Sequence, residues 1–192
     1  MHQVERRGVR LKVLVTYYSE TGNTEKIARA IYEEVSKEHE AYLKKINEVT
    51  ADALNNYELV FLGSACHSAD LAAPVKKILD AVPTSPRFKL AGFFTHSTLC
   101  SGDSARTQKL FDRWAGKCIV SFDKVSMEKR IDFKGYYHCQ GVPSLPIQEF
   151  IKKEIIESAD EWKGYIEEVR KHPGSEDVQE AKSFAREVLS KS

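Results

Sequence analysis

The stretch Tyr18-Ser19-Glu20-Thr21-Gly22-Asn23-Thr24 lies between two segments whose apolar residues follow different patterns. Residues 11–18 form an apolar run, which predicts a buried strand, and residues 25–35 carry apolar side chains at helical spacing. The first backbone N–H groups of a helix have no partners inside the helix, and the helix dipole adds partial positive charge there. A hydroxyl-rich turn between a strand and a helix is therefore a candidate phosphate-binding loop.

The side chains of this loop suit a phosphate monoester bound without a metal. The hydroxyls of Ser19, Thr21 and Thr24 and the amide of Asn23 can donate hydrogen bonds to phosphate oxygens, and Gly22 lets the backbone come close. No Gly-Lys-Ser/Thr follows, so the loop lacks the lysine and the magnesium-binding hydroxyl of a P-loop NTPase. A single glycine also makes a Rossmann dinucleotide turn a poor match. The alternative is a loop that only caps the helix.

Residues 17–24, followed by Ala28 and Ile31, resemble the signature of the flavodoxin family. Thr16, in the strand before the loop, departs from the aliphatic or aromatic residue that the family usually has. In that family the loop holds the phosphate of FMN. The resemblance therefore implies FMN as the cofactor, with a phosphate site that includes Ser19, Glu20, Thr21, Gly22, Asn23 and Thr24.

The composition indicates one domain with a core of its own. The chain has 192 residues, of which 42% are hydrophobic, and a formal net charge of +1. This balance indicates no general attraction to nucleic acid, and it departs from the strongly acidic flavodoxins that act as general electron carriers. No apolar run reaches the length of a membrane span, and no signal-peptide core follows the charged residues at positions 1–8. We expect a cytoplasmic protein without membrane insertion and with one flavodoxin-like domain, residues 1–192.

The four cysteines, Cys66, Cys100, Cys118 and Cys139, are far apart in the sequence and form no C-x-x-C pair. This spacing argues against a zinc ribbon and against the compact motif of iron–sulfur flavoproteins. In a reducing compartment we expect free thiols that are mostly buried.

Strands and helices alternate after the first loop. Apolar runs predict further strands at residues 41–46, 57–63 and 89–95, of which 41–46 is half polar, as expected at a sheet edge. This alternation predicts an α/β fold with a parallel sheet covered on both faces. The resemblance implies a flavodoxin-like, three-layer, doubly wound sheet of five parallel strands in the order 2-1-3-4-5. Ligands bind such a sheet beyond the carboxyl ends of its first and third strands.

Two segments are candidates for the last strand. Residues 118–122 predict a strand, and residues 135–139 are either a second piece of it or a strand of their own. The locally basic segment 124–134 between them is either a solvated excursion or a docking surface for an acidic partner.

From Leu145 onward the sequence predicts helices that are interrupted at residues 172–175. The flavodoxin-like core is expected to cover about residues 10–171, with residues 175–192 as an extra C-terminal helical appendage. We expect this helix to pack on the outer helices of the sheet or at a subunit interface, which leaves a homodimer open.

The loop after the third strand, residues 63–68, resembles the family loop that passes under the isoalloxazine ring of FMN. The resemblance implies cofactor contacts from Ser64, Ala65, Cys66 and His67. Ala65 replaces the usual proline, and His67 stands at the aromatic position. Imidazole can stack on a flavin with less area than Trp or Tyr, and in its protonated form it stabilises the anionic reduced ring. Cys66 either contacts the ring edge or is an inert small residue.

The loop after the fourth strand contributes Thr95, His96 and Ser97, with His96 and Ser97 expected to face the pyrimidine edge of the flavin. The tyrosine with which the family usually covers the second flavin face is absent. This absence predicts an open face, which suits hydride transfer from a nicotinamide or a substrate stacked on the ring.

Three functions are compatible with these features. The first is an FMN-binding soluble electron carrier, the second an FMN-dependent NAD(P)H:quinone or other acceptor oxidoreductase, and the third a flavin-free interaction module. The partner is accordingly another redox protein, or NAD(P)H and a small acceptor. With a net charge of +1 and histidines in two flanking loops, the final reduction potential is expected to be less negative than in acidic flavodoxins. No residue is assigned a catalytic role, and no metal ligand is expected.

Overall fold

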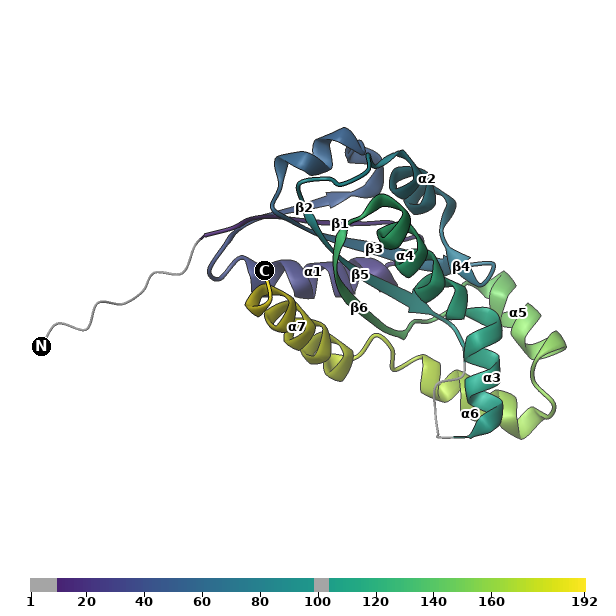
Figure 1. The fold of residues 1–192 in the computed structure, drawn as a ribbon. Helices are drawn as coiled ribbons and strands as arrows, with labels where there is room; N and C mark the ends of the chain where they lie inside the picture. Colours follow the sequence, from purple (N-terminus) through teal and green to yellow (C-terminus); the bar gives the residue numbers. More distant parts are fainter. Residues whose placement is uncertain (1–9, 99–103) are drawn as a thin grey trace, which may run out of the picture.

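Five parallel strands form the centre of the molecule in the order β2-β1-β3-β5-β6 (Figure 1). The structure is a computed structural model that describes residues 10–98 and 104–192, so Cys100 lies outside the described residues. The strands are β1 (Lys12–Tyr17), β2 (Glu40–Lys45), β3 (Leu59–His67), β5 (Lys89–His96) and β6 (Asp132–Gln140); β4 (Asp70–Leu71) pairs antiparallel with β3. Counted by parallel strands alone, this order is the predicted 2-1-3-4-5, with the half-polar β2 at an edge as expected.

The helices lie between and after the strands. They are α1 (Asn23–Val35), α2 (Ala73–Ala81), α3 (Ala105–Trp114), α4 (Gly116–Lys129), α5 (Leu145–Glu154), α6 (Ala159–Val169) and α7 (Ser175–Ser190), with short 3-10 helices η1 (Ile46–Glu48) and η2 (Asp52–Asn56). None of the helices within the described residues is long and apolar enough to cross a membrane.

The period of two along each strand divides the core into two layers. Val13 and Val15 of β1 pack with Ile27 and Ile31 of α1, while Leu14, between them in sequence, packs on the opposite face with residues of α2 and α4. Figure 1 shows α1 and α7 on one side of the sheet and α2 and α4 on the other. The three-layer α/β architecture is therefore confirmed.

The prediction of a strand at residues 118–122 is wrong, because these residues belong to α4. Cys118, Phe122 and Val125 follow one another at helical spacing and are buried against the sheet, whereas Val120 is 61% exposed. A short apolar run has no distinct helical or strand period, and here the helix was mistaken for a strand. The last strand is β6, which contains residues 135–139, and the basic segment 124–134 is divided between α4 and β6 rather than forming an excursion.

Helix α7 packs against α1, one of the helices that cover the sheet, as expected. Ala181, Ala185 and Val188 are buried in the same cluster as the apolar residues of β1. Ion pairs at 2.9 Å join Lys182 to Glu33 and Arg186 to Glu34 along the edge of this contact. The C-terminal helix thus contributes to the core layer on this side of the sheet.

Helices α5 and α6 form a separate unit between β6 and α7, visible beside α3 in Figure 1. Ile151, Tyr165 and Val169 form a small cluster of their own between the two helices. Arg106 of α3 fastens this unit through Glu161 and, at 3.4 Å, Glu157. The unit therefore lies beside the carboxyl end of the sheet without belonging to the main core.

The buried face of α7 generates a stability prediction. Replacing Ala185 by Asp places a carboxylate where the side chain is 0% exposed, and we expect unfolding free energy to fall by about 3 kcal/mol or more. Gln179→Asp on the exposed side of the same helix is the control, with an expected change of about 0.5 kcal/mol or less. Urea denaturation measures both, and equal stabilities would contradict the role of α7 in the core.

Candidate functional site

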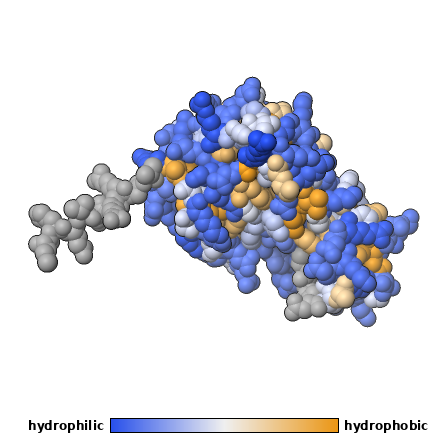
Figure 2. Space-filling view, viewed as in Figure 1, coloured by the Kyte–Doolittle hydropathy of each residue, from blue (hydrophilic) through white to orange (hydrophobic). Residues whose placement is uncertain are grey.

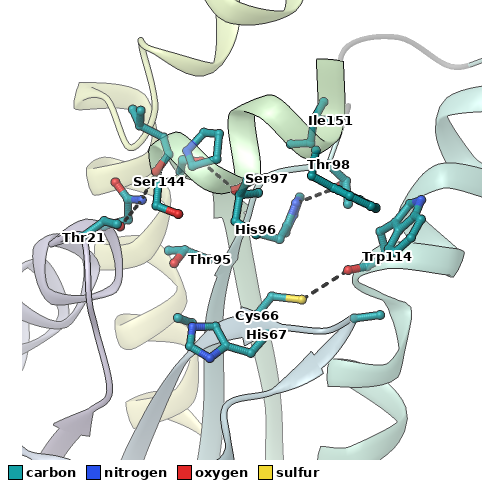
Figure 3. A pocket seen from close by; sticks show the side chains of 18 of the residues that line it. Thr21, Cys66, His67, Thr95, His96, Ser97, Thr98, Trp114, Ser144 and Ile151 are labelled. Carbon is teal, nitrogen blue, oxygen red and sulfur yellow. Dashed lines mark hydrogen bonds between the residues drawn. The ribbon is translucent and has the colours of Figure 1, made fainter. Parts of the chain in front are cut away.

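The loops that follow β1, β3 and β5 meet at the carboxyl end of the sheet. Two backbone hydrogen bonds continue the strand pairing into these loops: Tyr18 N–H donates to Gly63 O at 3.0 Å, and Ala65 N–H donates to Tyr18 O at 3.2 Å. Above them lies a cavity of about 580 Å³ (Figure 3). The residues predicted as cofactor contacts that line it are Glu20, Thr21, Asn23, Ala65, Cys66, His67, Thr95, His96 and Ser97.

The amino end of α1 lies at one end of this cavity. Gly22 stands at the N-cap with a φ of 88° and with no side-chain cap on the first turn. The Ser19 hydroxyl instead accepts from Gly22 N–H at 3.2 Å. The first N–H groups of α1 therefore receive no side-chain cap from the chain, which is the arrangement that favours an anion. The structure therefore does not have the alternative arrangement, in which side chains of this loop cap α1.

Asn23 connects this loop to a segment that the sequence did not single out. Its amide nitrogen donates to Thr21 Oγ1 at 2.9 Å and to Val142 O at 2.8 Å. A Cβ atom on Gly141 would lie 2.7 Å from the Asn23 side chain. Residues 141–144 therefore form part of the cavity wall. They reach it through a contact between distant parts of the chain, which no local sequence pattern predicts.

Four predicted contacts lie behind or beside the cavity lining: Ser19, Gly22, Thr24 and Ser64. Thr24 is buried, and its hydroxyl bonds to that of Thr95 at 2.8 Å. Ser64 is also buried, where its hydroxyl donates to Ala65 O and accepts from Ala72 N–H. Thr24 and Ser64 thus hold the loops in place.

His67 lies at the floor of the cavity in Figure 3. Its Nε2 atom lies 3.3 Å from Glu20 Oε2, and the two form an ion pair when the imidazole is protonated. The other Glu20 oxygen accepts from the Tyr18 hydroxyl at 2.6 Å, and the Tyr18 and His67 rings meet edge to face at 5.6 Å. The phosphate loop and the third-strand loop are thereby joined through side chains as well as backbone.

Cys66 is half-buried in the cavity lining, and its thiol donates to Trp114 O at 3.3 Å. The Cys118 thiol lies within hydrogen-bonding reach of Cys66, and this contact together with burial raises the pKa of Cys118. Cys66 and Cys118 are free thiols, and Cys118 and Cys139 are buried, as expected.

His96 is buried at the back of the cavity between two partners. Its Nδ1 atom bonds to the Thr98 hydroxyl at 2.9 Å and its Nε2 atom to His138 Nδ1 at 3.1 Å. Burial, with smaller effects of His138 and His172, lowers the pKa of His96 to about 3, and burial also lowers the pKa of His138. His96 is neutral near pH 7, so it adds no positive charge to favour reduction of a flavin.

Helices α3 and α5 provide a wall that the sequence did not predict. Leu110 and Trp114 come from α3, and Ile147, Phe150 and Ile151 come from α5. The Trp114 and Phe150 rings meet edge to face at 5.4 Å, and the Tyr165 hydroxyl ties α6 to Ser97 O at 2.8 Å. The apolar spacing of 147, 151 and 155 was visible in the sequence, but only the fold brings it to the cavity, where an open side was expected.

Within the described parts of the chain, no group of three or more His, Cys, Asp or Glu side chains is placed to hold a metal ion. The cavity has an uncapped helix end that favours an anion at one end, and apolar and aromatic walls at the other. This is an α/β protein with a site for a flat organic cofactor that carries a phosphate.

The flavodoxin domain profile matches residues 14–186, so the chain belongs to the flavodoxin family, whose cofactor is FMN. The flavodoxin-like domain-containing protein BilS of Clostridioides difficile (strain CD3) is 27% identical over 188 residues, or 94% of this chain and 98% of that protein. Oxidised flavodoxin 2 from Bacillus cereus superposes with a TM-score of 0.62 at 19% identity, covering 94% and 99% of the two chains. A flavodoxin from the domain Archaea gives 0.59 at 17% identity, covering 94% and 97%.

The contact between Gly141 and Asn23 generates a binding prediction. Gly141→Ala forces the Asn23 side chain to move, and we expect FMN to bind about tenfold more weakly, a change of about 1.4 kcal/mol. Gly164→Ala on α6 is the matched control, because a Cβ atom there meets nothing within 4 Å. Fluorescence titration with FMN measures both affinities, and equal affinities would contradict the role of Asn23.

The His96–His138 pair generates a pH prediction. The pKa values of both groups are lowered in the folded state, so as pH falls below the unfolded value of about 6.5 the unfolded chain binds more protons and is favoured. Each group then costs up to about 1.4 kcal/mol of stability per pH unit. His138→Gln keeps a hydrogen-bond donor and should flatten the decline between pH 6.5 and 5. Urea denaturation at several pH values tests this, and parallel profiles would count against it.

Proposed function

We propose that this chain is an FMN-binding electron carrier that exchanges electrons with another redox protein in the cytoplasm. The observation that carries the proposal is the cavity itself. At one end it has an amino end of α1 without a side-chain cap, and at the other it has apolar and imidazole walls that suit an isoalloxazine ring. When bound, FMN supplies reversible electron transfer.

Different residues would hold different parts of the cofactor. The α1 amino end, with the Thr21 hydroxyl that Asn23 positions, would hold the phosphate, while Cys66 and His67 would lie under the ring. Ser97, tied to Gly141 O at 3.3 Å and to Tyr165, would flank its pyrimidine edge. The Glu20–His67 contact keeps a carboxylate beside the imidazole at this side of the ring.

The wall formed by α3 and α5 favours a carrier over a nicotinamide-dependent reductase. Hydride transfer requires a nicotinamide to stack directly on the flavin, with reacting atoms about 3–3.5 Å apart. Trp114, Ile147 and Phe150 line the same cavity as Cys66 and His67, and they would narrow the space in which a nicotinamide could stack. Electron transfer between proteins needs no such space.

Titration of the purified protein with FMN and with riboflavin tests the proposal. We expect the protein to bind FMN and to show the flavin absorption band at about 450 nm. We expect FMN to bind about 100-fold more tightly than riboflavin, because only FMN carries the phosphate that meets the α1 amino end. The FMN-loaded protein should oxidise NADH and NADPH no faster than free FMN does.

Each contrary result points to one alternative. No uptake of either flavin would support the flavin-free module. Turnover of NADH or NADPH with a quinone well above that of free FMN would support the reductase. Equal affinity for FMN and riboflavin would refute the phosphate site at α1.

A further inference from the structure

Helix α5 exposes apolar side chains at the mouth of the cavity. Of the six large apolar side chains that are exposed among the described residues, three belong to this one helix. Leu145 is 75% exposed, Ile147 47% and Phe150 40%, and the last two also line the cavity. Figure 2 shows apolar atoms among hydrophilic ones in the lobe that Figure 1 identifies as α3, α5 and α6. Ile147 and Phe150 lie toward one face of α5, and an exposed apolar patch is a candidate interaction site.

The charges of α3 and α5, taken together, are mainly positive. Residues 105–117 and 145–154, named here the α3–α5 rim, contain six basic and three acidic residues, a net charge of +3; of the basic residues, Arg106 is paired with Glu157 and Glu161 at the start of α6. The Arg113 guanidinium lies 5.0 Å from the centre of the Trp114 ring, which lines the cavity. Within the described residues, neither Lys109 nor Arg113 forms an ion pair, so their charges are available to a partner.

We infer that the α3–α5 rim is the docking surface for an acidic redox protein. Aromatic and aliphatic side chains at the centre of a contact, with arginine and other charges around them, are the usual composition of a protein interface. The positive charge is local to the rim, and it would steer an acidic partner toward the side of the molecule where Trp114 and Phe150 line the cavity. Leu145, outside the cavity lining, extends the contact beyond what a small acceptor would cover. The inference rests on the proposed electron-carrier function.

A charge-reversal pair tests the rim. Lys109→Glu with Arg113→Glu reverses two of its unpaired positive charges, and Arg10→Glu with Arg87→Glu is the matched control. The control residues are exposed and precede β1 and β5, at the opposite edge of the sheet. Both pairs change the net charge equally. The probe is an oxidised plant-type [2Fe–2S] ferredoxin, an acidic one-electron carrier, with a basic c-type cytochrome as the opposite-charge comparison.

Binding is measured by calorimetry at low and at high ionic strength. We expect ferredoxin to bind the unchanged chain in a salt-sensitive manner and about tenfold more weakly to the rim pair, with less than a twofold change for the control pair. Stopped-flow reduction of the FMN-loaded chain by reduced ferredoxin should slow by a similar factor. Leu145→Ser should weaken ferredoxin binding while FMN affinity stays constant.

Several results would overturn the inference. These are equal weakening by both charge-reversal pairs, no salt-sensitive ferredoxin binding, or preference for the basic cytochrome. Self-association in sedimentation that Leu145→Ser abolishes, without an effect on ferredoxin, would assign the rim to a second copy of the chain. Failure of FMN uptake would refute the proposed function separately, because ferredoxin binding to the flavin-free chain still reports on the rim.

Discussion

The parallel register of β1, β3 and β5 is the constraint on which the site depends. Because the three strands end at the same edge, the loops that follow them must lie together, and backbone bonds from Tyr18 to Gly63 and from Ala65 to Tyr18 extend this pairing beyond β1. Directly below, a Cβ atom on Gly63 would lie 2.2 Å from the Phe93 ring. Packing in the core therefore fixes the position of the third-strand loop, which forms the floor of the cavity.

The distribution of charge around the cavity follows from burial. Groups at the back of the site are neutral and bonded to one another, as in the Thr24–Thr95 contact and the His96–His138 pair. A charge there would lose its hydration without a counterion. Ionised groups lie at the margins instead, with Glu20 beside His67 on one side and Arg113 above Trp114 on the other. The surface of the cavity mouth, rather than its interior, therefore sets the charge that an approaching molecule meets.

The sequence predicted the features that depend on local pattern. The alternation of strands and helices and the helix after the first loop follow from periodicity and from one glycine, and the order of the parallel strands follows from the resemblance to a family. The helix at residues 116–129 was not predicted, because a short apolar run fits a strand and a helix equally well. Gly141 and Trp114 were missed for a different reason. They reach the cavity only through contacts between elements distant in sequence, and nothing in their own neighbours indicates those contacts.

The helices α5 and α6 show how such a fold acquires a distinct surface. The sheet core is completed by α7, which returns to α1, so the segment between β6 and α7 is free to form a unit with its own small cluster around Ile151 and Tyr165. Polar contacts hold that unit in place, among them Arg106 to Glu161 and the Tyr165 hydroxyl to Ser97 O. Residues of α5 can therefore differ without disturbing the sheet, yet each difference alters both a wall of the cofactor cavity and the surface that a partner meets. With the proposed docking surface, cofactor environment and partner choice would be coupled through one helix.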